Sequence, residues 1–188
     1  LDFNEFLKDF EVDHVMEMSL FDLEAICEEY EIDLHTLLFK AVFLETSLKE
    51  KLKKIKLLIL DVDGVMTDGG MTFTAKGDEV KRFNTKDGMG ILKLNDTEVE
   101  LGIISSGFST QIVEKRAKML HIENCYVGRK VKMSVLQSWI VEKGLKLEQV
   151  AMIGDDINDR EIMLGVGIAA CPADAVDEIK SIAHVVLK

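Results

Sequence analysis

The sequence is poor in the features that mark secreted, membrane and disulfide-stabilised proteins. It has 3 cysteines, and this odd, widely spaced set (Cys27, Cys125 and Cys171) predicts reduced thiols rather than a disulfide framework or a zinc site. No apolar run approaches the roughly 18 residues that a membrane-spanning helix needs, and the N-terminus lacks a signal-peptide pattern. We therefore expect a cytoplasmic protein that has no membrane partner.

Basic residues are also outnumbered by acidic ones, and the whole excess of acidic residues lies within residues 1–50. The net charge is -11, and residues 1–50 hold 14 acidic and 3 basic residues, whereas the remainder holds 20 of each. Because phosphate contacts require a basic face, this balance argues against a nucleic-acid partner. The shift in composition predicts an acidic helical extension over residues 1–50 and a second domain over residues 51–188.

The extension has the apolar spacing of amphipathic helices. In the stretch FNEFLKDF, apolar side chains recur every three or four residues, at Phe3, Phe6, Leu7 and Phe10. Residues 19–52 contain no proline, and we expect one or two helices there, with Ser19 or Asp22 as the N-cap. The phenylalanine face has two open interpretations: a surface for a partner, or a face that docks on the core.

From residue 55 onward, short apolar runs alternate with segments of helical period, which predicts an α/β fold with a parallel sheet and helices on both faces. The expected strands are 55–61, 99–104, 124–127, 149–153, 166–169 and 183–187. The expected helices are 88–95, 108–120, 131–143, 157–164 and 173–181, with Trp139 packed on an apolar face. The runs 71–75 and 79–84 flank Lys76-Gly77-Asp78 and predict a β-hairpin insertion after the first strand.

Polar residues follow three of the expected strands, at the edge where an open parallel sheet binds its ligands. The first strand runs into Asp61-Val62-Asp63-Gly64, the next into Ser105-Ser106-Gly107, and a later one into GDDIND at residues 154–159. The stretch GRKVKMS places Lys130 and Lys132 at the start of a helix. Because converging carboxylates repel one another unless a cation lies among them, the pattern predicts a Mg²⁺ site.

Such an edge holds the groups that phosphoryl transfer needs. A hydroxyl and a lysine beside the metal are able to bind phosphate oxygens. Asp61 would then attack phosphorus, while Asp63 would protonate the leaving oxygen and later activate water. The non-catalytic alternatives are a charged turn for the two aspartates and a helix N-cap for the serine pair.

The stretches LDVDGVMTDGG, IISSG, GRKVKMS and IGDDINDREIM resemble, in this order, the four motifs of the haloacid dehalogenase superfamily of phosphohydrolases. The resemblance covers residues 55–188. The intervening GDEVKRFNTKDGMGI is similar to the capless branch, which includes the 3-deoxy-D-manno-octulosonate 8-phosphate phosphatases and the nonulosonate 9-phosphate phosphatases. The resemblance implies a Rossmann-like core, Mg²⁺ as cofactor, an aspartyl-phosphate intermediate and a role in lipopolysaccharide biosynthesis.

The resemblance also implies catalytic and metal-binding roles. Asp61 corresponds to the phosphorylated nucleophile and to a magnesium ligand. Asp63 corresponds to the general acid/base, which gives the metal its backbone carbonyl. Asp155 corresponds to the third protein ligand, supported by Asp156 and Asp159.

Substrate-binding roles follow from the same resemblance. Ser106, followed by Gly107, corresponds to the phosphate-binding hydroxyl in preference to Ser105, and Lys132 to the phosphate-binding lysine, with Lys130 as an open alternative. The residues that match the substrate entrance are Asn84, Thr85, Lys86, Asp87 and Gly88. In this branch the hairpin, here residues 69–84, packs with its copies in a homotetramer.

Two departures from the family pattern bear on the substrate. The family commonly has a charged residue after the Ser/Thr-Gly pair, where this chain has Phe108, and usually continues in a Gly-rich tail, where this sequence ends in AHVVLK. We expect a phosphatase for a phosphorylated 2-keto-3-deoxy sugar acid. The alternatives are a phosphatase for another small phosphorylated metabolite and a non-catalytic oligomerisation module.

Overall fold

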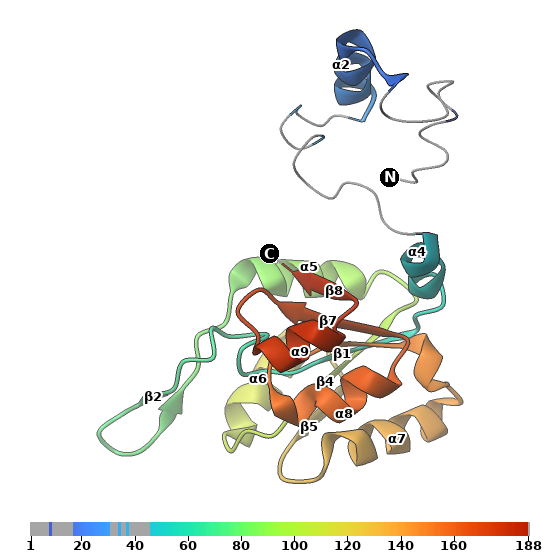
Figure 1. Cartoon of the computed structure of the whole chain (residues 1–188). Helices are drawn as coiled ribbons and strands as arrows, with labels where there is room; N and C mark the ends of the chain where they lie inside the picture. The colour runs from blue at the N-terminus through green and yellow to red at the C-terminus, as the bar shows by residue number, and fades with distance from the viewer. Residues whose placement is uncertain (1–7, 9–16, 31–33, 35–36, 38–45, 188) are drawn as a thin grey trace. The chain divides into compact units, whose positions relative to one another are not determined.

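The structure is a computed structural model that describes residues 8, 17–30, 34, 37 and 46–187 (Figure 1). It divides into two compact units, residues 1–50 and residues 51–188. The phenylalanine face expected over residues 3–10 lies outside the described residues. Within the described ranges, none of the helices combines the length and the apolar character of a membrane span.

In the first unit, helix α2 (Leu20–Glu29) begins as the sequence indicates. Ser19 is its N-cap, because the Ser19 hydroxyl accepts a hydrogen bond from the backbone N–H of Asp22 at 3.3 Å. The carboxylate of Asp22 accepts in return from the backbone N–H of Ser19 at 2.6 Å, which completes a capping box. A second helix, α4 (Thr46–Leu52), leads into the second unit.

The second unit is built on a parallel sheet whose strand order is β5-β4-β1-β6-β7-β8. Strand β1 (Leu57–Leu60) lies inside the sheet, and it pairs with β4 on one side and with β6 on the other. The other strands are β4 (Glu100–Ser105), β5 (Asn124–Val127), β6 (Val150–Ile153), β7 (Ile168–Pro172) and β8 (Val185–Leu187). The sheet confirms the predicted fold class.

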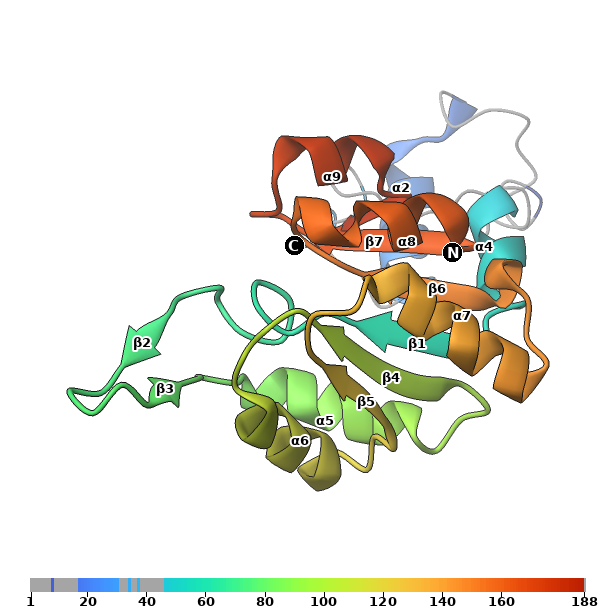
Figure 2. The same cartoon turned by 90° about the horizontal axis from the view of Figure 1, so that it is seen from below.

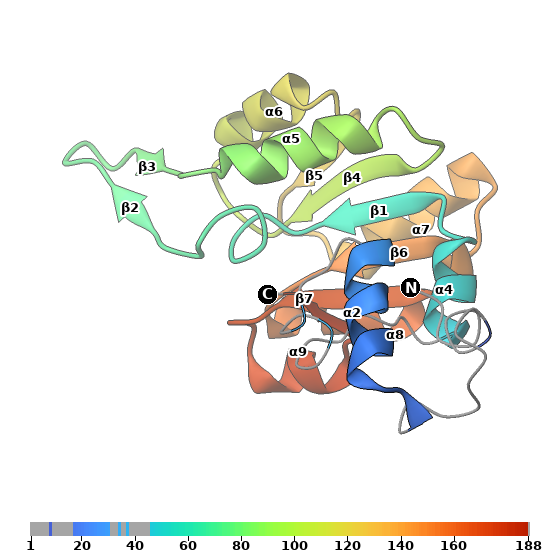
Figure 3. The ribbon, with the colours of Figure 1, turned by 90° about the horizontal axis from the view of Figure 1, so that it is seen from above.

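Helices cover both faces of this sheet (Figures 2 and 3). Successive side chains of a strand point to opposite faces, so Leu57 and Ile59 of β1 join one hydrophobic cluster while Leu58 and Leu60 join the other. The first cluster includes residues of α7, α8 and α9, and the second includes residues of α5 and α6. The helices are α5 (Thr85–Leu94), α6 (Thr110–Met119), α7 (Lys132–Lys143), α8 (Arg160–Gly165) and α9 (Asp177–Ile182).

Helix α7 packs closely on β4, and Trp139 is part of this contact. The Trp139 side chain is partly buried against the first cluster. A β-carbon placed at Gly102 of β4 would lie 3.0 Å from the Trp139 ring and 2.8 Å from Ile59, so glycine leaves the room that the indole fills. The expectation that Trp139 packs on the core is thus confirmed.

The predicted hairpin is present, although its strands are shorter than expected. Strands β2 (Thr72–Phe73) and β3 (Glu79–Val80) pair in antiparallel fashion, and Gly77 takes a positive φ of 89° in the turn. The hairpin extends away from the sheet (Figures 1 and 3). Consequently, Met71, Phe73 and Val80 are exposed.

Helix boundaries account for most of the remaining differences. Helix α5 begins at residue 85 rather than at 88, because the Asn84 side chain caps it by accepting from the N–H of Lys86 at 2.9 Å. The segment expected as one helix over 157–164 is a 3₁₀ turn, η3 (Ile157–Asp159), followed by α8. A second 3₁₀ turn, η2 (Leu147–Gln149), precedes β6.

Candidate active site

Three loops meet at the carboxyl edge of the sheet, because β4, β1 and β6 are neighbours and run in the same direction. They surround a cavity of about 290 Å³. The residues that line it are Asp61, Asp63, Gly69, Met71, Glu79, Ser105, Ser106, Gly107, Phe108, Asp155, Asp156 and Asn158. The predicted convergence of the three strand ends is therefore present in the fold.

Asp61 and Lys132 form a buried ion pair beside this cavity. The ammonium of Lys132, at the start of α7, lies 2.9 Å from Oδ1 of Asp61 and 2.6 Å from Oδ1 of Asp159. Asp61 and Lys132 are each 4% exposed, and Asp159 is fully buried. Lys130 is exposed, so of the two lysines that the sequence left open it is Lys132 that reaches Asp61.

Burial shifts the protonation equilibria of these carboxylates. Burial, reinforced by Asp159 and opposed by Lys132, raises the pKa of Asp61 to about 7. Burial, with the nearby Asp159 and Asp156, raises the pKa of Asp155 to about 6. Burial disfavours the charge of Lys132, but Asp61 and Asp159 outweigh it and raise the pKa of the lysine. Carboxylates that lie this close together repel one another when they are ionised. A bound cation would reduce that repulsion.

The carboxylates of Asp61, Asp155 and Asp159 fit a divalent metal. They offer oxygen atoms that all lie within 4.8 Å of one another. Oδ1 of Asp155 is buried and finds no hydrogen-bond partner among the described residues. Asp159 is already engaged on both oxygens, since Oδ1 meets Lys132 and Oδ2 accepts from the N–H of Asp155 at 3.2 Å. Hard oxygen donors of this kind suit Mg²⁺, and of the three carboxylates it is Asp61 and Asp155 that line the cavity.

Gly64 is the residue that allows Asp155 to come so close to the first strand. It has a positive φ of 84°, which glycine adopts at little cost. A β-carbon at this position would overlap with Oδ2 of Asp155 and would lie 3.0 Å from Oδ1. The glycine after Asp63 is therefore required by the position of the Asp155 carboxylate.

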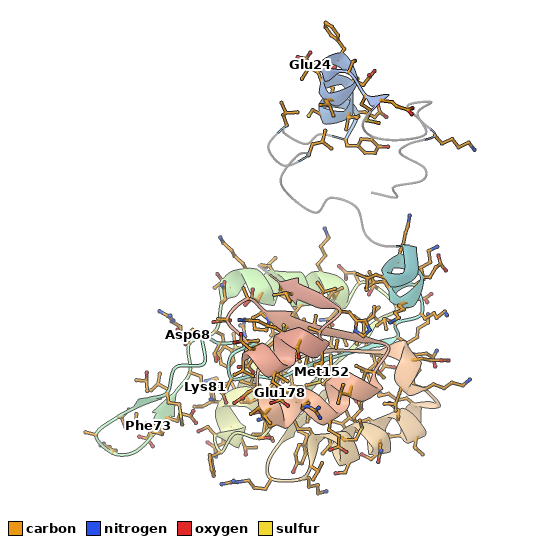
Figure 4. All side chains as sticks on the ribbon, viewed as in Figure 1. Glu24, Asp68, Phe73, Lys81, Met152 and Glu178 are labelled. Carbon is orange, nitrogen blue, oxygen red and sulfur yellow. The ribbon has the colours of Figure 1, made fainter. Side chains whose placement is uncertain are left out.

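The structure adds two residues that the sequence reasoning missed, Lys81 and Glu79. Lys81 lies at the base of the hairpin (Figure 4), and its ammonium contacts the carboxylate of Asp63 and, at 2.8 Å, that of Glu79. The hydroxyl of Ser109 donates to Glu79. Burial disfavours the charge of Lys81, but its two carboxylate partners outweigh it and raise its pKa. The predicted strand alternation over residues 79–84 was the available signal, since it puts Glu79 and Lys81 on one face.

Ser105, the last residue of β4, and Ser106, which follows it, have different surroundings. Ser105 is 1% exposed, and its hydroxyl accepts from the N–H of Gly107 at 3.0 Å, so it shapes the turn. Ser106 is only partly buried and lines the cavity. A β-carbon at Gly107 would lie 3.5 Å from Oδ2 of Asp63, which places this turn beside the predicted acid/base.

The five residues predicted at the substrate entrance lie at the start of α5 and away from Asp61. Asn84, Thr85 and Asp87 line a different cavity, of about 460 Å³, which shares no lining residue with the one around Asp61. Lys86 is exposed. Gly88 is buried, and a β-carbon there would lie 2.6 Å from the guanidinium of Arg116. Within one chain none of these residues lines the cavity around Asp61.

A family model and a curated protein that match this chain both point to the same family of hydrolases. A family model described as haloacid dehalogenase-like hydrolase matches residues 126–188. The chain is 37% identical over 139 residues to the 3-deoxy-D-manno-octulosonate 8-phosphate phosphatase KdsC of Yersinia pestis, an alignment that covers 74% of each chain.

Solved structures agree with the sequence comparison. The crystal structure of the Yersinia pestis phosphatase superposes with a TM-score of 0.74 at 34% identity, over 77% of this chain and 78% of that one. The phosphatase of the same name from Moraxella catarrhalis, in complex with a magnesium ion, a phosphate ion and a KDO molecule, superposes with a TM-score of 0.74 at 28% identity, over 77% of this chain and 83% of that one.

Proposed function

The chain belongs to the haloacid dehalogenase superfamily of phosphoric monoester hydrolases, in the branch of the 3-deoxy-D-manno-octulosonate 8-phosphate phosphatases, and from this premise we propose that it hydrolyses such a sugar acid phosphate through Asp61. The observation that carries the proposal is the position of the Asp61 carboxylate. It is buried at the tip of β1, 2.9 Å from the ammonium of Lys132, and shares a carboxylate cluster with Asp155.

In the first half of the reaction, a carboxylate oxygen of Asp61 attacks phosphorus while the bond from phosphorus to the sugar oxygen breaks. Asp63, two residues farther along the same turn, gives its proton to that leaving oxygen. The product is a free sugar acid and a phosphoryl group on Asp61. The contact of Lys81 with Asp63 stabilises the carboxylate that remains after the proton has left.

In the second half, Asp63 takes a proton from a water molecule, whose oxygen attacks the phosphoryl group and restores Asp61. Ser106 and Gly107 line the same cavity, and the Ser106 hydroxyl would bind a phosphate oxygen there. The ammonium of Lys132 lies beside Asp61, where its positive charge also attracts the phosphate oxygens.

The carboxylates of this site would be completed by a magnesium ion. Mg²⁺ would be held by Asp61, Asp155 and the backbone carbonyl of Asp63, and when bound it withdraws charge from the phosphate oxygens. The unpartnered Oδ1 of Asp155 supports this assignment.

The hairpin supports a homotetramer as the working form. Its exposed apolar side chains, Met71, Phe73 and Val80, are typical of a surface that another copy covers. In such an assembly, the segment from Asn84 to Gly88 would line the substrate entrance, and a neighbouring subunit would add contacts from across the interface. The free thiols of Cys27, Cys125 and Cys171 fit a cytoplasmic location.

The test is phosphate release from 3-deoxy-D-manno-octulosonate 8-phosphate, with Mg²⁺ and with EDTA, by the wild-type chain and by Asp61→Asn. We expect hydrolysis that requires Mg²⁺ in the wild type and none in the variant, whose circular dichroism should match that of the wild type. Magnesium-dependent turnover by Asp61→Asn would remove Asp61 from its role. A panel of other phosphorylated sugars tests the alternative that a different small metabolite is the substrate.

A further inference from the structure

Phe108, at the cavity, forms a stacked pair with Arg129, which is not itself a lining residue. Phe108 follows β4 and lines the cavity together with Asp61. The guanidinium carbon of Arg129 lies 4.0 Å from the centre of the Phe108 ring, which is a cation-π contact. Arg129 follows β5, the neighbour of β4 in the sheet, so two adjacent strand ends supply the pair.

The backbone on both sides of Arg129 is fixed. The N–H of Gly128 donates to the carbonyl of Ser105 at 3.0 Å, and the N–H of Lys130 donates to the Tyr126 hydroxyl at 3.0 Å. A β-carbon at Gly128 would lie 2.7 Å from that hydroxyl. Glycine at this position therefore leaves space for the Tyr126 hydroxyl to accept the hydrogen bond from Lys130. These contacts hold the arginine beside the turn that carries Phe108.

Arg129 is available for an anion, unlike the two lysines of the site. Lys132 is paired with Asp61 and Asp159, and Lys81 with Asp63 and Glu79. Among the ion pairs of the described residues, none involves Arg129. Stacking uses only the flat face of the guanidinium and leaves its N–H groups free to donate in the plane, where they match a carboxylate.

We propose that Arg129, supported by the Phe108 ring, binds the carboxylate of the substrate and selects phosphorylated sugar acids over neutral sugar phosphates. The inference rests on the proposed function, because it takes Asp61 as the residue that meets the phosphate. A substrate with a phosphate and a carboxylate at opposite ends of its chain needs a second cation. The charged residues that line the cavity are all acidic and repel such a group: Asp61, Asp63, Glu79, Asp155 and Asp156.

The experiment compares the wild type with Arg129→Gln, Arg129→Lys and Phe108→Leu. The substrates are 3-deoxy-D-manno-octulosonate 8-phosphate, p-nitrophenyl phosphate, and the matched pair 6-phosphogluconate and glucitol 6-phosphate, which differ only in a carboxylate. Lys146→Gln, an exposed charge change outside the site, serves as the control. Circular dichroism establishes that each variant is folded.

We expect Arg129→Gln to raise KM for both acids by roughly tenfold to a hundredfold, the effect of losing a charge-assisted hydrogen-bonded pair. The kinetics on p-nitrophenyl phosphate and glucitol 6-phosphate should stay as in the wild type. Arg129→Lys should recover part of the loss, because it keeps the charge, and Phe108→Leu should show a smaller loss on the acids alone.

Equal losses on acids and neutral phosphates, or no loss on the acids, would overturn the role of Arg129. A different result is expected if 3-deoxy-D-manno-octulosonate 8-phosphate is not the substrate. The wild type would then hydrolyse p-nitrophenyl phosphate but not the octulosonate phosphate, and its preference within the matched pair would still decide the inference. A wild type with no magnesium-dependent hydrolysis at all would overturn both.

Discussion

Replacing Gly64 by alanine tests whether the position of Asp155 controls the metal site. The new methyl group would overlap with Oδ2 of Asp155, so the carboxylate must move. We expect weaker Mg²⁺ binding together with a moderate loss of stability, and hence an activity that recovers in part when Mg²⁺ is raised.

The Gly64→Ala substitution is expected to lower two quantities, the free energy of unfolding and the affinity for Mg²⁺. An alanine held at the φ of 84° found at Gly64 costs about 1–2 kcal/mol of the free energy of unfolding, because its β-carbon crowds the backbone. Displacing a ligand from its supported position typically weakens a metal site by about 10- to 100-fold in dissociation constant, which corresponds to about 1.4–2.7 kcal/mol. The two losses are separable, since the first persists in EDTA and the second does not.

Gly144→Ala is the matched control. Gly144 is the C-cap of α7 and has a positive φ of 64°, but among the described residues no atom beyond its own stretch of chain lies within 4 Å of the position its β-carbon would take. Urea denaturation in EDTA should show that both variants are destabilised. Calorimetric titration with Mg²⁺ should show weakened binding in Gly64→Ala alone. If Gly64→Ala bound Mg²⁺ as tightly as Gly144→Ala, Asp155 would not be a ligand in this position.

Three further predictions concern the acid/base, the metal and the assembly. Lys81→Gln should lower kcat by roughly tenfold without changing Mg²⁺ affinity, because Asp63 loses the partner that orients it; a change in KM alone would contradict this. Because folding raises the pKa of Asp61 to about 7 and that of Asp155 to about 6, the metal-free fold binds extra protons and loses stability as the pH rises through this range. The rise in melting temperature on adding Mg²⁺ should therefore be larger at about pH 8 than at about pH 5.5, and an equal rise would refute the argument. Phe73→Glu should shift the sedimentation profile toward smaller species, whereas an unchanged profile would exclude the hairpin from the interface.

The sheet and the catalytic edge could be predicted because strand ends are marked in the sequence. The apolar runs before Asp61 and before Ser105 each stop at a polar turn, and their order along a parallel sheet brings the turns together. The edge itself thus follows from local pattern and topology alone. By contrast, the choice between Lys130 and Lys132 depends on the residue at which α7 begins, which a pattern fixes only to within a few residues.

Long-range pairs could not be predicted. The alternation around Lys81 shows which face of the hairpin strand it occupies, but its partner Asp63 is set by how the hairpin folds back on the first turn. The contact between Phe108 and Arg129 likewise joins two loops that are distant in sequence. Such contacts are products of tertiary packing, on which local propensity carries no information.

The contact between Trp139 and Gly102 has a practical consequence for any spectroscopic study. The chain has 1 tryptophan, and it lies in the second unit, so indole emission is an intrinsic probe of that unit. Far-ultraviolet circular dichroism followed in the same urea titration reports the helices of both units. Coincident curves would show that the acidic segment and the catalytic body unfold together.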